Sequence, residues 1–267
     1  MRPFGMPPTV GAMTDLALRD RGAGTPLLLL HAFPLNAGMY RAQLDGALGT
    51  ARVLAPDLPG FGDSPAPVGE PSLERWADQL AGLLDAAGVR TAVVGGVSMG
   101  GYLAMAFARR HPDRLAGLLL ADTKASADAP AALANRERIA AAVLARDSVA
   151  LLLEEKTEDS LLGPDSTGEL IAEVRALIGA AGPAGVAWAQ RAMAARPDSF
   201  ATLEGLRVPA TVVVGEYDAL TPVADAEAMA MALPDAELTV IPGVGHLSAL
   251  EAPAAFNAAV TALLRRV

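Results

Sequence analysis

The chain has no cysteine, only three histidines in 267 residues, and few aromatic side chains, at 4%. The absence of cysteine excludes disulfide bridges, thiolate nucleophiles and cysteine-ligated metals. Three histidines offer few nitrogen ligands for a metal ion. The chain also lacks an apolar run near the roughly 20 residues of a membrane-spanning helix, because its longest candidate, residues 26–34, is interrupted by His31 and bounded by prolines. We therefore expect no membrane span.

Positive charge is scarce as well. The chain carries 21 basic and 30 acidic side chains, a formal net charge of -9. This balance repels phosphate backbones and anionic lipid surfaces, so nucleic acid is not expected as a partner. Residues 1–12 have one arginine, three prolines and no continuous apolar core, unlike a secretion signal. We interpret them as a leader without function and expect a cytoplasmic protein.

Apolar residues make up 52% of the chain, enough for a large core in one α/β domain with an insertion. Short β-rich runs alternate with Ala-rich helical patterns, which predicts a mostly parallel, twisted sheet flanked by helices. The expected strands are 14–18, 27–31, 52–56, 91–97, 115–121, 210–215 and 237–242. The expected helices include 72–87, 99–110, 222–232 and 253–266.

Between residues 122 and 206 the pattern changes to helical segments alone, broken by glycine and proline. We therefore predict a core of residues 1–122 and 207–267 and a helical cap of residues 123–206. Apolar side chains of this cap are expected to line a cavity over the sheet edge, although most of them suit plain helix packing as well: Leu151, Leu152, Leu161, Leu162, Leu170, Ile178, Trp188 and Met193.

The most informative stretch is 96–100, Gly-Val-Ser-Met-Gly, which lies between a buried strand and a helix. This context predicts a nucleophilic serine on a strained turn, because small residues at 96 and 100 let the strand and the helix pass closely. Ser98 is thus the expected nucleophile. A protonated hydroxyl is a poor nucleophile, so Ser98 needs a general base.

His246 is the best candidate for that base. It follows the last predicted strand on a Gly-rich loop, at the edge where open α/β sheets bind their ligands. His31 is better placed to shape the loop beside it. His111 precedes Pro112 at a helix end, where an imidazole often caps carbonyls.

The group that holds the other imidazole nitrogen is expected to be Asp218, one strand earlier. Glu216 and Asp122 are its competitors. Asp218 could also act only in an Asx turn or helix cap before Thr221 and Pro222.

The tetrahedral intermediate needs two N–H donors aimed at its oxyanion. The amide of Met99, at the start of the helix, supplies one and profits from the helix dipole. The amide of Phe33 is our choice for the second, since Pro34 favours an extended Phe33.

The stretch 57–64 is rich in proline, glycine and acids, and we interpret it as a structural turn.

Together these positions resemble the α/β-hydrolase superfamily, in particular its capped bacterial carboxylesterases and 3-oxoadipate enol-lactonase-like enzymes. The resemblance runs from about Leu27 to the end and rests on residues 31–35, 57–64, 95–102, 120–123, 215–218 and 245–248. It implies a triad of Ser98, His246 and Asp218, an oxyanion hole from Phe33 and Met99, and no metal or organic cofactor. Ala32 departs from the glycine of many relatives.

The resulting expectation is a serine hydrolase that cleaves small carboxylic esters or lactones through an acyl-enzyme on Ser98. Carbon–carbon bond hydrolysis and peracid formation by the same triad stay open. A protein that binds a small molecule without turnover is also an open alternative.

No basic residue is assigned to the substrate, because most of the cap's cations suit solvated helix faces: Lys124, Arg136, Arg138, Lys156, Arg175, Arg191 and Arg196.

Overall fold

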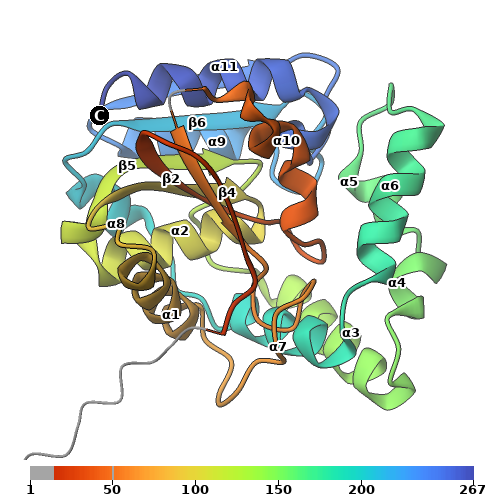
Figure 1. Ribbon diagram of the computed structural model, residues 1–267. Helices are drawn as coiled ribbons and strands as arrows, with labels where there is room; N and C mark the ends of the chain where they lie inside the picture. The colour runs from red at the N-terminus through yellow and green to blue at the C-terminus, as the bar shows by residue number, and fades with distance from the viewer. Residues whose placement is uncertain (1–14, 50) are drawn as a thin grey trace, which may run out of the picture.

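The computed structural model describes residues 15–49 and 51–267. Seven strands form one sheet in the order β1-β3-β2-β4-β5-β6-β7 (Figure 1). Only β1 runs antiparallel to its neighbour, and the other pairs are parallel. The predicted fold class is confirmed. The strands are β1 (Leu18–Gly22), β2 (Thr25–Leu30), β3 (Ala51–Pro56), β4 (Ala92–Val97), β5 (Leu115–Ala121), β6 (Ala210–Gly215) and β7 (Ala236–Ile241).

The central strands are buried along most of their length. β4 is buried at every position, and so is β6. Such continuous apolar strands are typical of a parallel sheet covered on both faces, which explains why the sequence located them within one or two residues.

The first strand was predicted in the wrong place. It was expected at 14–18, but β1 begins at Leu18 and pairs with β3 in the register Leu18 to Pro56. Its sequence, LRDRG, has no apolar alternation, because β1 is an edge strand whose charges reach solvent; Asp20 forms an ion pair with Arg52. Residues 1–12, interpreted as a leader, lie outside the described residues.

Helices cover both faces of the sheet. α1, α2, α8 and α9 form one layer, whereas α11 packs on the other side against β5, β6 and β7 (Figure 1). The core helices and short turns are η1 (Ala37–Tyr40), η2 (Gln43–Ala47), α1 (Leu73–Ala86), α2 (Met99–Arg110), η3 (Pro112–Arg114), α9 (Val223–Ala232), α10 (Ser248–Glu251) and α11 (Pro253–Leu264).

The chain between β5 and β6 contains helices and loops but no strand. It contains α3 (Pro130–Arg146), α4 (Ala150–Glu154), α5 (Thr157–Leu161), α6 (Gly168–Gly179), α7 (Pro183–Ala194) and α8 (Phe200–Gly205). In Figure 1, α4, α5 and α6 lie to the right of the sheet, beyond the carboxyl ends of its parallel strands. α8 instead contacts α2 and α9 in the core layer.

Aromatic packing joins this helical segment to the core. Trp188 of α7 stacks on Trp76 of α1 with ring centroids 4.5 Å apart, and its indole N–H donates to the carbonyl of Gly69 at 3.1 Å. Trp188 was expected among the cavity-lining side chains, but its ring is held against the core by this stacking.

No single helix in the described part of the chain is both long and apolar enough to cross a membrane. α6 and α7 meet that criterion only when taken together, and they are bent by 94° where they join.

Replacing Gly100 by alanine tests the close packing of β2, β4 and α2. A Cβ at position 100 would lie 1.9 Å from the carbonyl oxygen of Leu30, a backbone atom with little freedom to move. We expect Gly100→Ala to lower the free energy of unfolding by about 3 kcal/mol, measured by urea denaturation. Gly205→Ala is the control, because a Cβ there has no neighbour within 4 Å. Equal stability of the two variants would contradict this packing.

Candidate active site

Ser98 occupies the turn between β4 and α2, with φ 56° and ψ -114°. This conformation with a positive φ is strained for a residue with a side chain and persists only where its surroundings hold it. Two contacts do so: the Ser98 amide donates to the carbonyl of Ala121 at 2.9 Å, and the Thr123 hydroxyl donates to the Ser98 carbonyl at 2.8 Å. The sequence context of Ser98 is therefore found as a strand, a strained turn and a helix.

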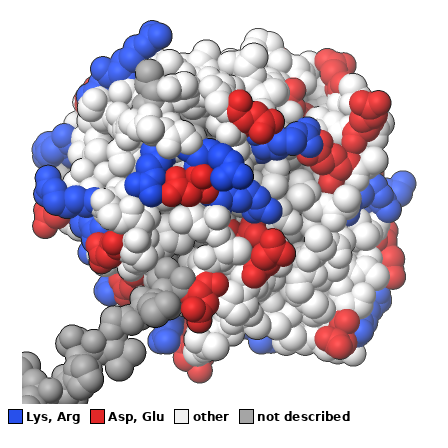
Figure 2. Space-filling view, viewed as in Figure 1, with Lys and Arg blue, Asp and Glu red and all other residues white. Residues whose placement is uncertain are grey.

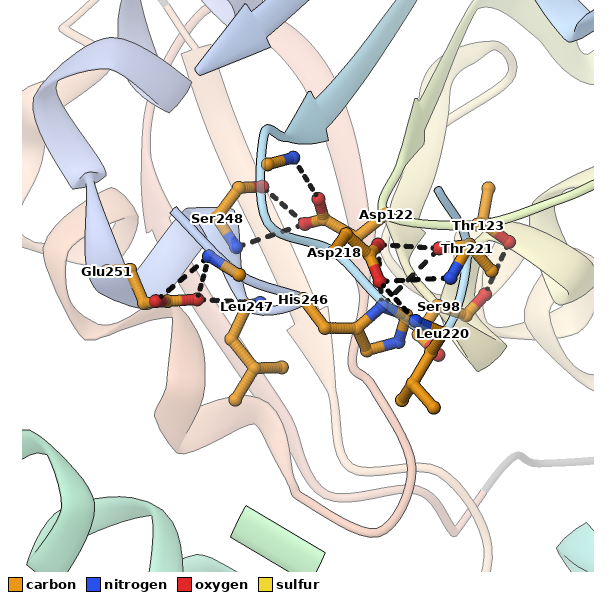
Figure 3. A network of polar contacts seen from close by, with 12 residues as sticks. Ser98, Asp122, Thr123, Asp218, Leu220, Thr221, His246, Leu247, Ser248 and Glu251 are labelled. Atoms are coloured by element: carbon orange, nitrogen blue, oxygen red, sulfur yellow. Dashed lines mark hydrogen bonds and ion pairs between the residues drawn. The ribbon is translucent and has the colours of Figure 1, made fainter. Parts of the chain in front are cut away.

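His246 and Asp218 form a buried pair. Nδ1 of His246 lies 2.8 Å from Oδ2 of Asp218, and only 2% of His246 is exposed (Figure 3). Asp218 also accepts the amides of Leu220 and Thr221, each at 2.9 Å, and the Thr221 hydroxyl at 2.6 Å. The Asx turn and the contact with histidine were considered as alternatives, yet one carboxylate makes both.

The two groups of this pair have pKa values shifted in opposite directions. Burial raises the pKa of Asp218, but hydrogen bonds from His246 and Thr221 and the imidazole charge outweigh burial, so that its pKa lies below the ordinary value. Burial also disfavours charge on His246, but the hydrogen bond and negative charge of Asp218 raise the pKa of His246 above 6.5. The pair thus favours an ionised acid beside an imidazole that takes up a proton readily.

The competing residues are used elsewhere. Glu216 is exposed and accepts the amide of Gly243 at 3.0 Å. Nε2 of His31 accepts the amide of Leu58 at 2.9 Å, which ties the loop after β2 to the loop after β3. Burial lowers the pKa of His31 to about 4. His111 was expected to cap carbonyls, but its Nε2 lies 2.9 Å from Oδ1 of Asp78 on α1.

The stretch 57–64 is a hydrogen-bonded turn after β3. Oδ1 of Asp57 accepts the amide of Ala37 at 2.8 Å and the Arg19 guanidinium at 2.9 Å, while Oδ2 accepts the amide of Asp63 at 3.0 Å. The Ser64 hydroxyl donates to the Asp57 carbonyl at 2.6 Å. These polar groups are therefore engaged in the structure of the turn.

Ser98 and His246 line one cavity of about 310 Å³, together with Phe33. The helical segment between β5 and β6 supplies most of its remaining wall. Of the apolar side chains expected there from the sequence, Leu161 and Met193 line this cavity.

The amides of Phe33 and Met99 are the two donors predicted for the oxyanion hole. Met99 is the first residue of α2, so its N–H has no partner within the helix. Among the described residues, neither amide donates to another backbone group. Phe33 precedes a cis bond to Pro34.

Asp122 is a second buried acid near the pair. Its Oδ1 accepts the amide of Gly215 at 3.0 Å, and its Oδ2 accepts the amide of Ser248 at 3.0 Å and the Ser248 hydroxyl (Figure 3). It makes no hydrogen bond to His246. Asp122 instead joins the end of β5 to the end of β6 and to the histidine loop, and burial raises its pKa to about 7.

Sequence reasoning missed three residues that hold these loops: Thr221, Thr123 and Glu251. Thr221 had a signal, because a hydroxyl three residues after an aspartate can close an Asx turn. Glu251 had none: its carboxylate accepts the amides of Gly245 and Leu247, each at 3.1 Å, and that of Gly163 at 2.7 Å. The contact with Gly163 joins segments 88 residues apart, and such a contact leaves no local pattern.

Asp122→Asn tests the state of the second acid. Because the folded pKa of Asp122, about 7, exceeds the ordinary 3.8, the folded protein holds a proton between these values that the unfolded chain releases. This contribution to stability is present at low pH and is lost as the pH rises from 3.8 to about 7. We expect the free energy of unfolding of the parent protein to fall over this interval relative to that of Asp122→Asn, measured in urea at several pH values.

The matched control is Asp113→Asn, which removes an exposed acid. A stability difference between Asp122→Asn and the parent that stays constant from pH 4 to pH 7 would contradict the raised pKa.

Comparison with known proteins agrees with this architecture. Residues 25–253 match the family described as alpha/beta hydrolase fold. A malate-bound thermophilic esterase from Thermogutta terrifontis has 42% sequence identity and a TM-score of 0.89, covering 94% of this chain and 93% of its own. The enol-lactonase from Burkholderia xenovorans LB400 has 26% identity and a TM-score of 0.84, with 94% and 96% covered.

A shorter match comes from a curated relative. The 2-hydroxymuconate semialdehyde hydrolase of Pseudomonas putida is 41% identical over 111 residues, which span 39% of this chain and 38% of that protein. Within residues 15–49 and 51–267, no three His, Asp or Glu side chains gather as metal ligands do. Since the family match extends from β2 to the start of α11, the chain belongs to the α/β-hydrolase superfamily.

Proposed function

We propose that this hydrolase cleaves small carboxylic esters or lactones through an acyl-enzyme on Ser98. The observation that carries the proposal is a buried His246–Asp218 pair in the same site as a serine on a strained turn. Nucleophile, base and orienting acid in this arrangement define the serine-triad mechanism. The esterase and enol-lactonase neighbours support the substrate class.

The mechanism follows from the positions of these groups. Ser98 Oγ attacks the substrate carbonyl carbon while Nε2 of His246 takes the hydroxyl proton, and Asp218 stabilises the imidazolium. The amides of Phe33 and Met99 donate to the oxyanion, and each such donor is worth about 10²- to 10³-fold in rate. His246 returns its proton to the leaving oxygen. Water then repeats the sequence on the acyl-enzyme and regenerates Ser98.

Residues 123–206 act in this proposal as a cap over residues 1–122 and 207–267. The cap supports the base directly, because the amide of His246 donates to the carbonyl of Leu161 at 3.0 Å. Gly163 and Gly245 also meet so closely that a Cβ on Gly245 would lie 2.3 Å from the Gly163 nitrogen. A cavity of about 310 Å³ suits a small molecule rather than a peptide chain.

A second candidate is hydrolysis of a carbon–carbon bond by the same triad. The observation in its favour is the relative from Pseudomonas putida, whose named substrate, 2-hydroxymuconate semialdehyde, is neither an ester nor a lactone. Turnover of a vinylogous diketone without turnover of aliphatic esters would replace the ester proposal by this one.

Ser98→Ala tests the proposed nucleophile. We expect the parent protein to hydrolyse p-nitrophenyl acetate and to react covalently with a fluorophosphonate probe, and Ser98→Ala to lose both, with a fall in kcat of about 10⁶-fold. Ser148→Ala is the matched control, because that hydroxyl only accepts the amide of Ala150 in the turn after α3. Absence of labelling and turnover in the folded parent protein would leave a non-hydrolysing binder.

The pH dependence of kcat/KM tests the base and its acid. His246 acts as a base only when neutral, and its pKa is raised above 6.5, so activity is expected to fall on the acidic side with a midpoint above 6.5. Asp218→Asn removes the charge that raises this pKa. We expect the midpoint to move to lower pH and kcat to fall by about 10⁴-fold.

Glu216→Gln is the control for that experiment, since Glu216 is an exposed acid two residues away. A midpoint that stays in place in Asp218→Asn, or moves equally in Glu216→Gln, would exclude Asp218 as the orienting acid.

A further inference from the structure

Four charged side chains gather where the cap meets the candidate site. Lys124 and Asp128 lie in the segment that leads from β5 to α3, Arg136 lies on α3, and Arg196 follows α7. Lys124, Asp128 and Arg136 line the cavity that holds Ser98 and His246. The sequence suggested that most cap cations suit solvated helix faces, and Lys124 and Arg136 are exceptions, since their side chains are only 23% and 17% exposed.

Asp128 is already neutralised by the two arginines. Its side chain is 1% exposed; Oδ1 accepts Nη2 of Arg196 at 2.9 Å, and Oδ2 accepts Nε of Arg136. Burial raises the pKa of Asp128, but the hydrogen bonds and charges of the two guanidinium groups lower it to about 2. The single negative charge of Asp128 is thus already paired with two arginines, so it does not neutralise a third cation.

Lys124 is that third cation. Its Nζ lies 3.9 Å from Oδ1 of Asp128, too far for a hydrogen bond, and donates to no acceptor among the described residues. An ammonium carries three donors, and its side chain here is only 23% exposed. Lys124 lines the cavity, so the donors of this ammonium are available to a bound molecule.

Arg136 has an unused donor at the same cavity. Its Nε is bonded to Asp128 and its Nη1 to Oε1 of Gln190 at 2.9 Å. Within the described residues its Nη2 makes no hydrogen bond to the protein. Two cationic donors without protein acceptors therefore line the cavity that also exposes the nucleophile.

This concentration of cations contrasts with the rest of an acidic chain. The formal net charge is -9, and Lys124 and Lys156 are the only lysines. Figure 2 shows a group of basic side chains around acidic ones near the centre of the face drawn, and side chains of both signs elsewhere on that face. The other carboxylate of the site, Asp218, is engaged with the His246 imidazole.

We propose that Lys124, assisted by Arg136, binds a carboxylate of the substrate, so that the enzyme prefers esters or lactones that carry a free carboxylate. This inference rests on the proposed function, since it names the substrate class of the Ser98 site. A neutral acyl chain would displace water from the ammonium without offering acceptors in its place, whereas one carboxylate supplies both acceptors and a negative charge.

The experiment compares substrates that differ by one methyl group and one charge: the monomethyl and dimethyl esters of succinate, glutarate and adipate. The measured quantity is the ratio of kcat/KM for the monoanion to kcat/KM for the neutral diester, obtained by methanol release. We expect Lys124→Met to lower this ratio by about 10- to 100-fold, the loss of one charged hydrogen bond. Added salt should lower the ratio of the parent protein in the same direction.

Lys156→Met is the matched control, because it removes the other, exposed lysine from the same helical segment. An unchanged ratio in Lys124→Met at all three chain lengths would overturn the proposal. So would an equal loss in Lys156→Met, which would indicate a long-range effect of net charge. Thermal melting of each variant confirms that it is folded.

A binding measurement separates this proposal from the proposed function. Calorimetry follows glutarate binding to Ser98→Ala and to the double variant Ser98→Ala, Lys124→Met. Weaker binding to the double variant supports the carboxylate site even if no ester is hydrolysed, and equal binding refutes it even if Ser98 is the nucleophile.

Discussion

The site depends on a close approach between the backbones of β2, β4 and α2. Cβ atoms on Gly96 and Gly100 would lie 2.2 Å and 1.9 Å from the same carbonyl oxygen, that of Leu30. Only glycine permits this contact, and the contact forces the chain to turn sharply at Ser98. The strained φ of 56° is then maintained by hydrogen bonds to β5 and to the segment after it. The packing of the sheet itself therefore presents the hydroxyl at the strand ends.

Two buried carboxylates meet at these strand ends but serve in different ways. Asp218 faces an imidazole and three donors, so its charge is favoured despite burial. Asp122 faces two backbone amides and a hydroxyl but forms no ion pair with any described residue, and burial outweighs the opposing charge of His246 in setting its pKa. The first raises the pKa of His246, and the second connects the ends of β5 and β6 to the loop that carries His246. Both depend on hydrogen bonds that satisfy the carboxylate oxygens inside the protein.

The helical segment between β5 and β6 is more than a wall of the cavity. The amide of His246 donates to the carbonyl of Leu161, the amide of Gly163 donates to Glu251 of α10, and Trp188 stacks on Trp76 of the core. The position of His246 is therefore coupled to the packing of this segment. The same segment brings Lys124, Asp128 and Arg136 to the cavity that holds Ser98, which makes it the part of the molecule where we expect substrate preference to be set.

The sequence by itself determined the strands, the turn at Ser98 and the candidates for base and acid, because buried parallel strands and a nucleophile turn leave local patterns. It misplaced β1, since the position of an edge strand is set by its partner β3 rather than by its own residues. Tertiary structure alone decided that Asp218 rather than Asp122 meets His246, that Glu251 holds the histidine loop, and that Lys124 lacks an acceptor. Asp218 and His246 are 28 residues apart in the chain, and in all three cases only the folded distances between atoms determine which groups are paired.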